Sequence, residues 1–245
     1  LAAGLVEVVP TAHYLMGGVV VDVETRTSLA GLYVAGEDAG GAHGSNRLGG
    51  NGVANSTVYG GIAGDVMAAD AQKMGALHDP DETILDQELA RAIIPFSAKP
   101  GNVQELRVRL MDAMWDDVGV MRDAAGLMCG IEKIASLKSD MENVGVSGDN
   151  LAFNLSWHDW LSLQSLIDTS EVIAKAGLSR ENSRGAHFRE DFPDAGSLDD
   201  SYFTIATSGD KGIEVSREAV KFTIVKPGES LLGADEAETL VEAAQ

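Results

Sequence analysis

A single arginine stands in a glycine-rich segment of a strongly acidic chain. Residues 41–52 read GAHGSNRLGGNG, with Arg47, His43 and no acidic side chain, whereas the 245 residues together carry a formal net charge of −20. Glycines let a ligand approach the backbone closely, and a guanidinium can bind a carboxylate through two parallel hydrogen bonds. The segment therefore predicts a site for a small anion, which Arg47 would attract against the repulsive field of the chain. For His43, a packing role and a supporting role in the site are both open.

The motifs of several other site types are absent from the sequence. It contains neither the G-x-G-x-x-G nor the G-x-x-x-x-G-K-[ST] phosphate loop, and no G-x-S-x-G nucleophile elbow. Its five histidines are dispersed, without Cys/His or H-E-x-x-H spacing, so we expect no metal site. The 38 acidic against 18 basic residues argue against nucleic acid as a partner, and no uncharged run is apolar enough to span a membrane.

Two β-type runs precede the glycine-rich segment, and a helix follows it. Residues 18–25 and 31–38 are short apolar runs bounded by glycines, which predicts strands. After the loop, the pattern predicts a helix from about Asn51 to Met74, whose glycines and alanines favour close packing on a sheet. A strand, a glycine-rich turn and a helix together present backbone N–H groups and the positive end of the helix dipole to a ligand. We therefore expect residues 1–78 to form a partial α/β domain.

A proline-containing linker separates this region from a predicted helix bundle. Residues 79–101 include three prolines and one short helical pattern at about 83–94, which is typical of a domain boundary. Between 102 and 182, apolar side chains recur at spacings of three and four residues in three runs, which predicts an antiparallel three-helix bundle. The runs contain Val103, Leu106, Leu110, Met114, Val118 and Met121, then Leu127, Ile131, Ile134 and Met141, then Trp160, Leu163, Ile167 and Ile173. The single cysteine, Cys129, falls in the second run and is expected to be a buried apolar residue.

The remaining residues, 183–245, change from helical to turn and β-type patterns. A charged, turn-rich loop is followed by three β-type runs at 201–208, 212–216 and 220–225, and the last fifteen residues are acidic and alanine-rich, as in a loose helix or a tail. The predicted fold class is α+β but mainly α. It consists of a partial α/β segment, an antiparallel three-helix bundle and a short C-terminal β-rich region.

Five motifs occur in a fixed order along nearly the whole chain. They are PTAHYLMGG (10–18), GLYVAGED (31–38), HGSNRLGGN (43–51), MWDDVGVMR (114–122) and SRGAHFREDFP (183–193). Together with the three-helix pattern, they resemble the C-terminal half of the flavoprotein subunit of succinate dehydrogenase and fumarate reductase. This family also includes L-aspartate oxidase.

The resemblance implies an oxidoreductase that transfers hydride between FAD and a C4 dicarboxylate, succinate or fumarate. By motif, His13 and Arg47 would bind the substrate carboxylates, and Glu37 would hydrogen-bond FAD. Asn51, Gly52 and Val53 would lie against the flavin ring, with backbone N–H groups at the edge where charge accumulates on reduction. Gly52 replaces a serine found in many members, which backbone donation tolerates. Arg184 and His187 are expected to be structural, tying the loop after the bundle to the flavin domain.

The same resemblance implies that essential parts lie outside this sequence. In the family, the FAD diphosphate loop and the proton-transferring arginine belong to the N-terminal half, so no catalytic residue is assigned here. We expect a piece of a longer flavoprotein that binds FAD weakly and is inactive alone. Its expected partners are the missing N-terminal half, an iron–sulfur subunit with a membrane anchor, and a second copy of the chain through exposed apolar surface. The expected location is cytoplasmic or peripheral at the inner membrane. An L-aspartate oxidase-type fragment and a non-catalytic subunit-interaction module remain as alternatives.

Overall fold

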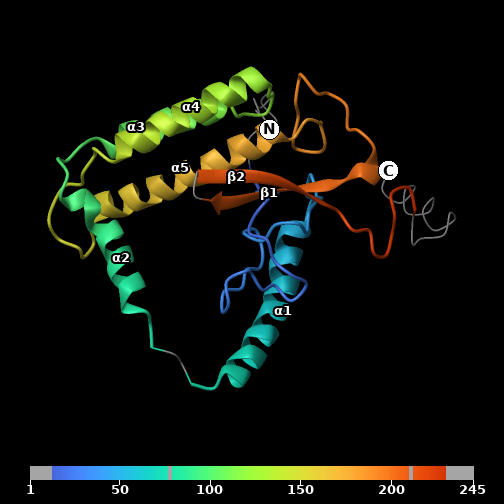
Figure 1. Cartoon of the computed structure of the whole chain (residues 1–245), viewed down its shortest axis with the longest axis horizontal. Helices are drawn as coiled ribbons and strands as arrows, with labels where there is room; N and C mark the ends of the chain where they lie inside the picture. Colours follow the sequence, from blue (N-terminus) through green and yellow to red (C-terminus); the bar gives the residue numbers. More distant parts are fainter. Residues whose placement is uncertain (1–12, 77–78, 210–211, 230–245) are drawn as a thin grey trace, which may run out of the picture.

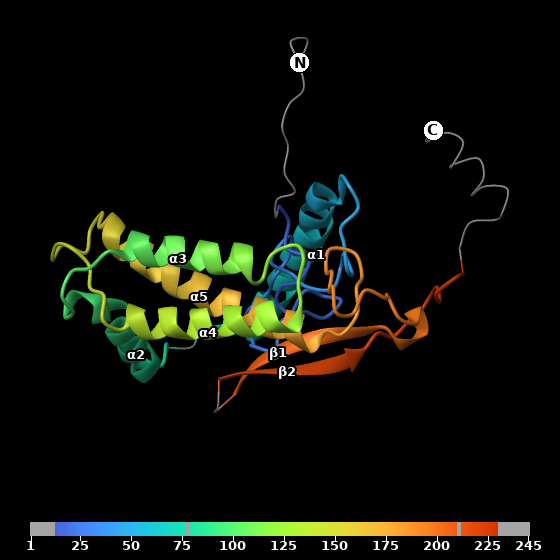
Figure 2. The same ribbon diagram turned by 90° about the horizontal axis from the view of Figure 1, so that it is seen from above.

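The computed structural model describes residues 13–76, 79–209 and 212–229, which form mainly helices (Figure 1). The elements in chain order are α1 (Asn51–Met74), α2 (Glu82–Ile93), the 3-10 turn η1 (Ile94–Phe96), α3 (Val103–Asp116), α4 (Ala124–Met141), α5 (Leu155–Ser179), the 3-10 turn η2 (Leu198–Asp200), β1 (Tyr202–Gly209) and β2 (Gly212–Ala219). Helices α3, α4 and α5 lie side by side along one direction, whereas α1 and α2 extend away from them (Figures 1 and 2). The mainly helical fold class predicted from the sequence is confirmed.

Each helix of the bundle begins at a side chain that caps its first turn. Asn102 accepts from the Glu105 N–H at 3.1 Å, Asp123 from the Gly126 N–H at 2.7 Å, and Asn154 from the Trp157 N–H at 3.1 Å. The three helices then bury their apolar faces against one another. The core contains Leu106, Leu110, Val118, Leu127, Ile134, Leu137, Met141, Val146, Trp160, Leu163, Ile167 and Ala174. The 3.6-residue period of the sequence therefore identified both the helices and the faces that they bury.

Two details of the predicted bundle are wrong. Helix α3 ends at Asp116, so Val118 and Met121 lie in the turn that follows, although Val118 still enters the core. The chain turns back sharply here and brings residue 119 close to the Trp115 carbonyl. Glycine permits this approach, because a Cβ at residue 119 would clash with that carbonyl. Cys129 is exposed rather than buried, since α4 buries Leu127 and Gly130 and turns Cys129 toward solvent.

The two strands predicted at 18–25 and 31–38 do not form as continuous strands. The structure has single β-bridges there instead, a parallel one between Val19 and Ala39 and an antiparallel one between Arg26 and Tyr33. Thr25 interrupts the first run, because its φ of 65° is a left-handed conformation that no extended strand allows. A β-type run needs neighbouring strands to pair with, and the described part of the chain supplies only these bridges.

The C-terminal β-region is a two-stranded hairpin rather than three strands. Strands β1 and β2 pair antiparallel from Tyr202↔Ala219 to Gly209↔Gly212, and the hairpin packs on α5. Residues 220–225, predicted as a third strand, do not form one; the Val220 N–H donates to the Ser201 carbonyl at 2.9 Å and thereby extends the hairpin by one contact. The acidic tail lies outside the described residues. No helix within the described ranges is both long and apolar enough to cross a bilayer.

Candidate active site

The glycine-rich segment ends where helix α1 begins, as the sequence predicted. Gly50 occupies the N-cap with a left-handed φ of 84°, and among the described residues no side chain caps the helix and no acidic residue lies in its first turn. The first N–H groups of a helix have no intrahelical acceptor, and the helix dipole makes this end positive. The start of α1 is therefore suited to face an anion or an electron-rich ring.

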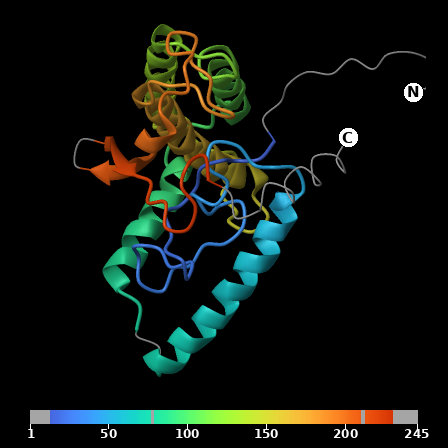
Figure 3. The same cartoon turned by 90° about the vertical axis from the view of Figure 1, so that its right-hand side faces the viewer.

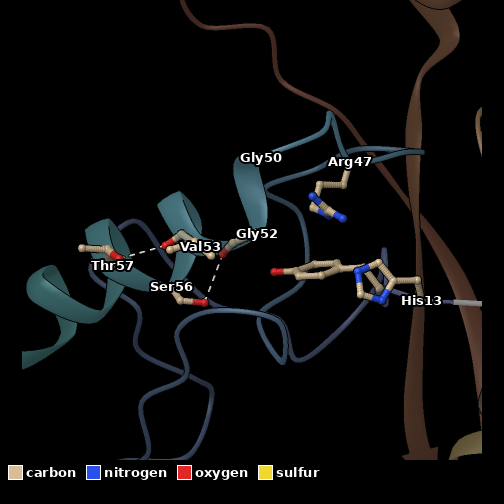
Figure 4. Close-up of a pocket in the computed structure, with 8 residues that line it drawn as sticks. His13, Arg47, Gly50, Gly52, Val53, Ser56 and Thr57 are labelled. Carbon is tan, nitrogen blue, oxygen red and sulfur yellow. Dashed lines mark hydrogen bonds between the residues drawn. The ribbon is translucent and has the colours of Figure 1, made fainter.

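A pocket of about 470 Å³ opens beside this helix end (Figure 4). Arg47 and His13 lie on one side of it and the first turns of α1 on the other. The lining residues are His13, Tyr14, Arg47, Gly50, Gly52, Val53, Ser56 and Thr57. Segments that are distant in sequence thus converge on one concave surface that carries a cation and a helix N-terminus.

Arg47 is held in place by several contacts, but one of its hydrogen-bond donors has no acceptor among the described residues. Its backbone N–H donates to the Met16 sulfur at 3.1 Å, its Nη1 donates to the Leu48 carbonyl at 3.3 Å, and its guanidinium carbon lies 4.6 Å from the centre of the Tyr14 ring. Its Nε is buried and has no acceptor among the residues that the structure describes. A buried donor without a partner is costly, which makes the Arg47 side chain a candidate for ligand binding.

The sequence did not single out two residues that organise this pocket, Tyr14 and Asn55. Asn55 is 6% exposed, and its Nδ2 lies 3.4 Å from the Tyr14 hydroxyl, 3.2 Å from the Gly36 carbonyl oxygen and 3.1 Å from His43 Nε2. It thereby joins three segments of the pocket wall and fixes the ring on which Arg47 lies. Two features of the sequence could have identified these residues: an asparagine within the predicted helix, and a tyrosine next to His13.

Gly52 lets these parts come together. A Cβ at this position would lie 3.1 Å from the Tyr14 ring and 3.7 Å from the Arg47 guanidinium carbon, which is tight for the ring contact. The absence of a side chain thus allows the N-terminus of α1 to approach the aromatic ring under Arg47.

The remaining predicted site residues lie around the pocket rather than in its lining. One oxygen of Glu37 accepts the Leu15 N–H at 3.0 Å, which holds the segment that carries His13 and Tyr14. Asn51 is the first residue of α1 and is exposed. His43 reaches the pocket through Asn55 and through an edge contact with the Tyr14 ring at 5.3 Å. His13, Arg47, Gly52 and Val53 are the predicted residues that meet in the lining.

An ion-pair network holds α1 against the segment before the glycine-rich loop. Asp70 on α1 accepts from Arg26 Nε at 2.9 Å and from the Tyr33 hydroxyl at 2.8 Å. These two hydrogen bonds hold the pKa of the Asp70 carboxyl well below its usual range, and the same contact with Asp70 raises the pKa of Tyr33. Helix α1, whose first turns line the pocket, is therefore held by Asp70 near its C-terminal end and by Asn55 near its N-terminal end. Within the described ranges, no group of three or more potential metal ligands is present.

Comparison with known proteins assigns the chain to a family. The model of the fumarate reductase flavoprotein C-terminal region matches residues 107–231, and that of an FAD binding domain matches residues 5–53. The chain belongs to the succinate dehydrogenase and fumarate reductase flavoprotein family. FAD is the cofactor of this family, and the match at 5–53 covers the whole glycine-rich segment and the start of α1.

Relatives in this flavoprotein family include enzymes of both expected types. One subunit of the CoM/CoB fumarate reductase of Methanothermobacter marburgensis is 37% identical over 190 residues, which cover 77% of this chain and 34% of that protein. L-aspartate oxidase of Yersinia pestis is 34% identical over 193 residues, which cover 77% of this chain and 33% of that enzyme. The solved structure of Mycobacterium smegmatis Sdh1 in complex with UQ1 superposes with a TM-score of 0.78 at 32% identity, covering 94% of this chain and 39% of that one. The chain thus spans between a third and two-fifths of the length of these relatives.

Proposed function

We propose that this chain supplies one wall of a flavin and C4-dicarboxylate site in an oxidoreductase of the succinate dehydrogenase and fumarate reductase type. The proposal depends chiefly on Arg47, whose buried Nε has no acceptor among the described residues and whose guanidinium lies in a pocket with His13 and the start of α1. A fixed guanidinium next to a second hydrogen-bonding side chain is suited to a carboxylate. Family membership supports the flavin part of the proposal.

The residues present fit one edge of a flavin and one carboxylate of the substrate. Arg47 and His13 would hold the carboxylate, and the N–H groups of Gly52 and Val53 would face the edge of the ring where negative charge develops. FAD, when bound, supplies the hydride acceptor or donor. The chain's own contribution is to bind and orient, because a carbon–carbon bond reacts with a flavin only when it is held flat against it.

The proposed assembly follows from the same family membership. Solved relatives belong to succinate dehydrogenase and quinol:fumarate reductase complexes. We propose that the intact protein combines this wall with an N-terminal FAD and capping half, and that at the inner membrane it docks on an iron–sulfur subunit. An L-aspartate oxidase-type enzyme is the second candidate, supported by the 34% identity to the Yersinia pestis enzyme.

Malonate binding tests the carboxylate site directly. We expect isothermal titration to show malonate binding to the full chain, and Arg47→Ala to weaken it by about 10- to 100-fold, the equivalent of the 1.5–3 kcal/mol typical of hydrogen bonds to charged groups. Arg47→Lys should restore binding only in part, because lysine cannot form the two-pronged contact.

Arg109→Ala is the matched control for this titration, since Arg109 pairs with Asp140 on the bundle surface. Its affinity for malonate should equal that of the wild type. Equal binding by wild type and Arg47→Ala, or none by either, would contradict the proposal. Repeating the titration with L-aspartate separates the two candidate substrates.

FAD retention tests the expectation that this wall alone is insufficient. The sequence contains no G-x-G-x-x-G loop to hold the diphosphate of FAD, so the contacts proposed for Glu37 and for the start of α1 would have to retain the cofactor. We expect the purified chain to lose added FAD during gel filtration and to show no succinate–acceptor activity. The absorbance of the protein peak near the flavin maximum measures this. Stoichiometric FAD in that peak would show that other residues of the chain hold the diphosphate.

A further inference from the structure

A tight turn after the bundle reaches the loop that carries Arg47. Residues 184–187 form a two-residue hairpin turn, in which the Arg184 N–H donates to the His187 carbonyl at 2.9 Å and the His187 N–H donates back at 3.0 Å. Gly185 and Ala186 form its tip, and Gly185 has a φ of 55°, which suits glycine at the first central position of such turns. The proposed function assigns no role to this turn.

The base of the turn is anchored firmly to the bundle and to the loop that follows it. The Arg184 guanidinium donates to the Ala195 and Ser197 carbonyls, each at 2.6 Å, and to the Ser201 hydroxyl at 2.8 Å. His187 Nδ1 lies 3.0 Å from Arg122 Nη1, and its Nε2 lies 3.1 Å from the Arg180 carbonyl oxygen. These contacts fix the base of the turn to the helical body.

The neutral form of His187 suits both of its contacts. Burial lowers the pKa of this imidazole, and the positive charges of Arg122, Arg180 and Arg189 lower it further, against an opposing effect of the Arg180 carbonyl. A neutral ring can accept from Arg122 on one nitrogen and donate to the carbonyl on the other. The anchor is therefore intact at neutral pH.

The tip of the turn contacts Ser45, which lies two residues before Arg47. The Ala186 N–H donates to the Ser45 carbonyl oxygen at 2.9 Å. A Cβ on Gly185 would lie 2.5 Å from that same oxygen and 2.7 Å from the Ser45 Oγ, so the turn can approach only because residue 185 is a glycine. This contact joins the region matched by the C-terminal family model to the region matched by the FAD binding domain model.

We propose that the 184–187 turn is a positioning element for the substrate arginine, with Gly185 and Ala186 fixing Ser45 and thereby the backbone from which Arg47 enters the pocket. This inference rests on the proposed function of Arg47 as a carboxylate ligand. Glycine-rich segments have many accessible conformations, so an external contact that selects one of them lowers the entropy cost of binding. The helix bundle, which contributes no residue to the pocket lining, would then act on the site through this turn.

Two pairs of substitutions test the role of the tip in the full chain. Gly185→Ala introduces the clash with Ser45, and Gly148→Ala is its matched control, because Gly148 also has a positive φ of 80° but its nearest neighbour to a Cβ is 3.8 Å away. Ala186→Pro removes the N–H that Ser45 accepts, whereas the conservative Ala186→Gly keeps it. Urea unfolding followed by circular dichroism confirms that the bundle is folded in each variant.

Two measurements decide the outcome. We expect Gly185→Ala and Ala186→Pro to weaken malonate binding by about fivefold or more, and to accelerate trypsin cleavage after Arg47 by a similar factor, because the loop is released. Gly148→Ala and Ala186→Gly should match the wild type in both. Unchanged cleavage and unchanged affinity in Gly185→Ala would overturn the inference while leaving the Arg47 site intact. Absence of malonate binding in the wild type would instead count against the proposed function, and faster cleavage would still establish that the turn restrains the loop.

Discussion

Replacing Arg189 by methionine is expected to lower the free energy of unfolding by about 3 kcal/mol, because each hydrogen bond to a charged group contributes about 1.5–3 kcal/mol and buried carbonyls lose their donor. Arg189 is 1% exposed and donates both to the Asp191 carboxylate, at 2.7 Å from Nε and from Nη2, and to the Gly177 and Leu178 carbonyls at 3.0 Å. Its charge also lies at the negative end of α5. Methionine keeps much of the volume and leaves these acceptors without a donor. Urea unfolding followed by circular dichroism at pH 7 measures the change.

A surface ion pair provides the control for Arg189. Arg109 and Asp140 form a pair at 2.8 Å with both side chains exposed, and such pairs contribute about 1 kcal/mol or less. Arg109→Met should therefore cost little. A loss below about 1 kcal/mol for Arg189→Met would show that water replaces its contacts.

The dependence of the free energy of unfolding on acid pH gives a second measurement of the contact between Arg189 and Asp191. The Arg189 guanidinium lowers the pKa of Asp191 to about 2, from an unfolded value near 3.9. A carboxyl whose folded pKa is lowered stabilises the protein above its unfolded pKa, and this contribution is lost as the pH falls through the folded pKa. The difference in stability between wild type and Arg189→Met should therefore narrow between about pH 4 and pH 2.

Leu163→Ala is expected to destabilise the bundle by about 2–5 kcal/mol, as for leucines removed from well-packed cores. Leu163 lies in the N-terminal half of α5, is 0% exposed and belongs to the core shared with α3 and α4. Truncation there removes apolar contact and leaves a cavity that three packed helices cannot readily close. Chemical unfolding of the full chain measures the loss.

Leu166 on the same helix is the matched control for this substitution. It is 41% exposed and lies outside the core, so Leu166→Ala should change the free energy of unfolding by less than about 1 kcal/mol. Similar losses for the two alanine variants would mean that the helices do not pack as the structure has them. Figure 3 shows α1 extending away from the bundle. The core of the bundle contains no residue of α1, so the loss is expected to be confined to the bundle.

The predictions from sequence differed in accuracy between the helices and the N-terminal β-type runs. The apolar period of residues 102–182 gave all three helices and most of their buried faces, because both properties depend on residues three and four positions apart. The runs at 18–25 and 31–38 have β-type composition, but strands also need partners, and the described chain pairs them only at Val19–Ala39 and Arg26–Tyr33. The left-handed conformation of Thr25 could not be read from a residue type that normally avoids it.

By itself, the sequence determined the helical bundle, the family and the motif residues His13 and Arg47, because periodicity and short motifs are local properties of the chain. Only the tertiary structure decided how these residues are held. Tyr14 lies under Arg47, Asn55 joins three segments around it, and the tip at Gly185 rests on Ser45. Each of these contacts joins residues distant in sequence, and each depends on angstrom-scale fit, which no pattern of residue types encodes.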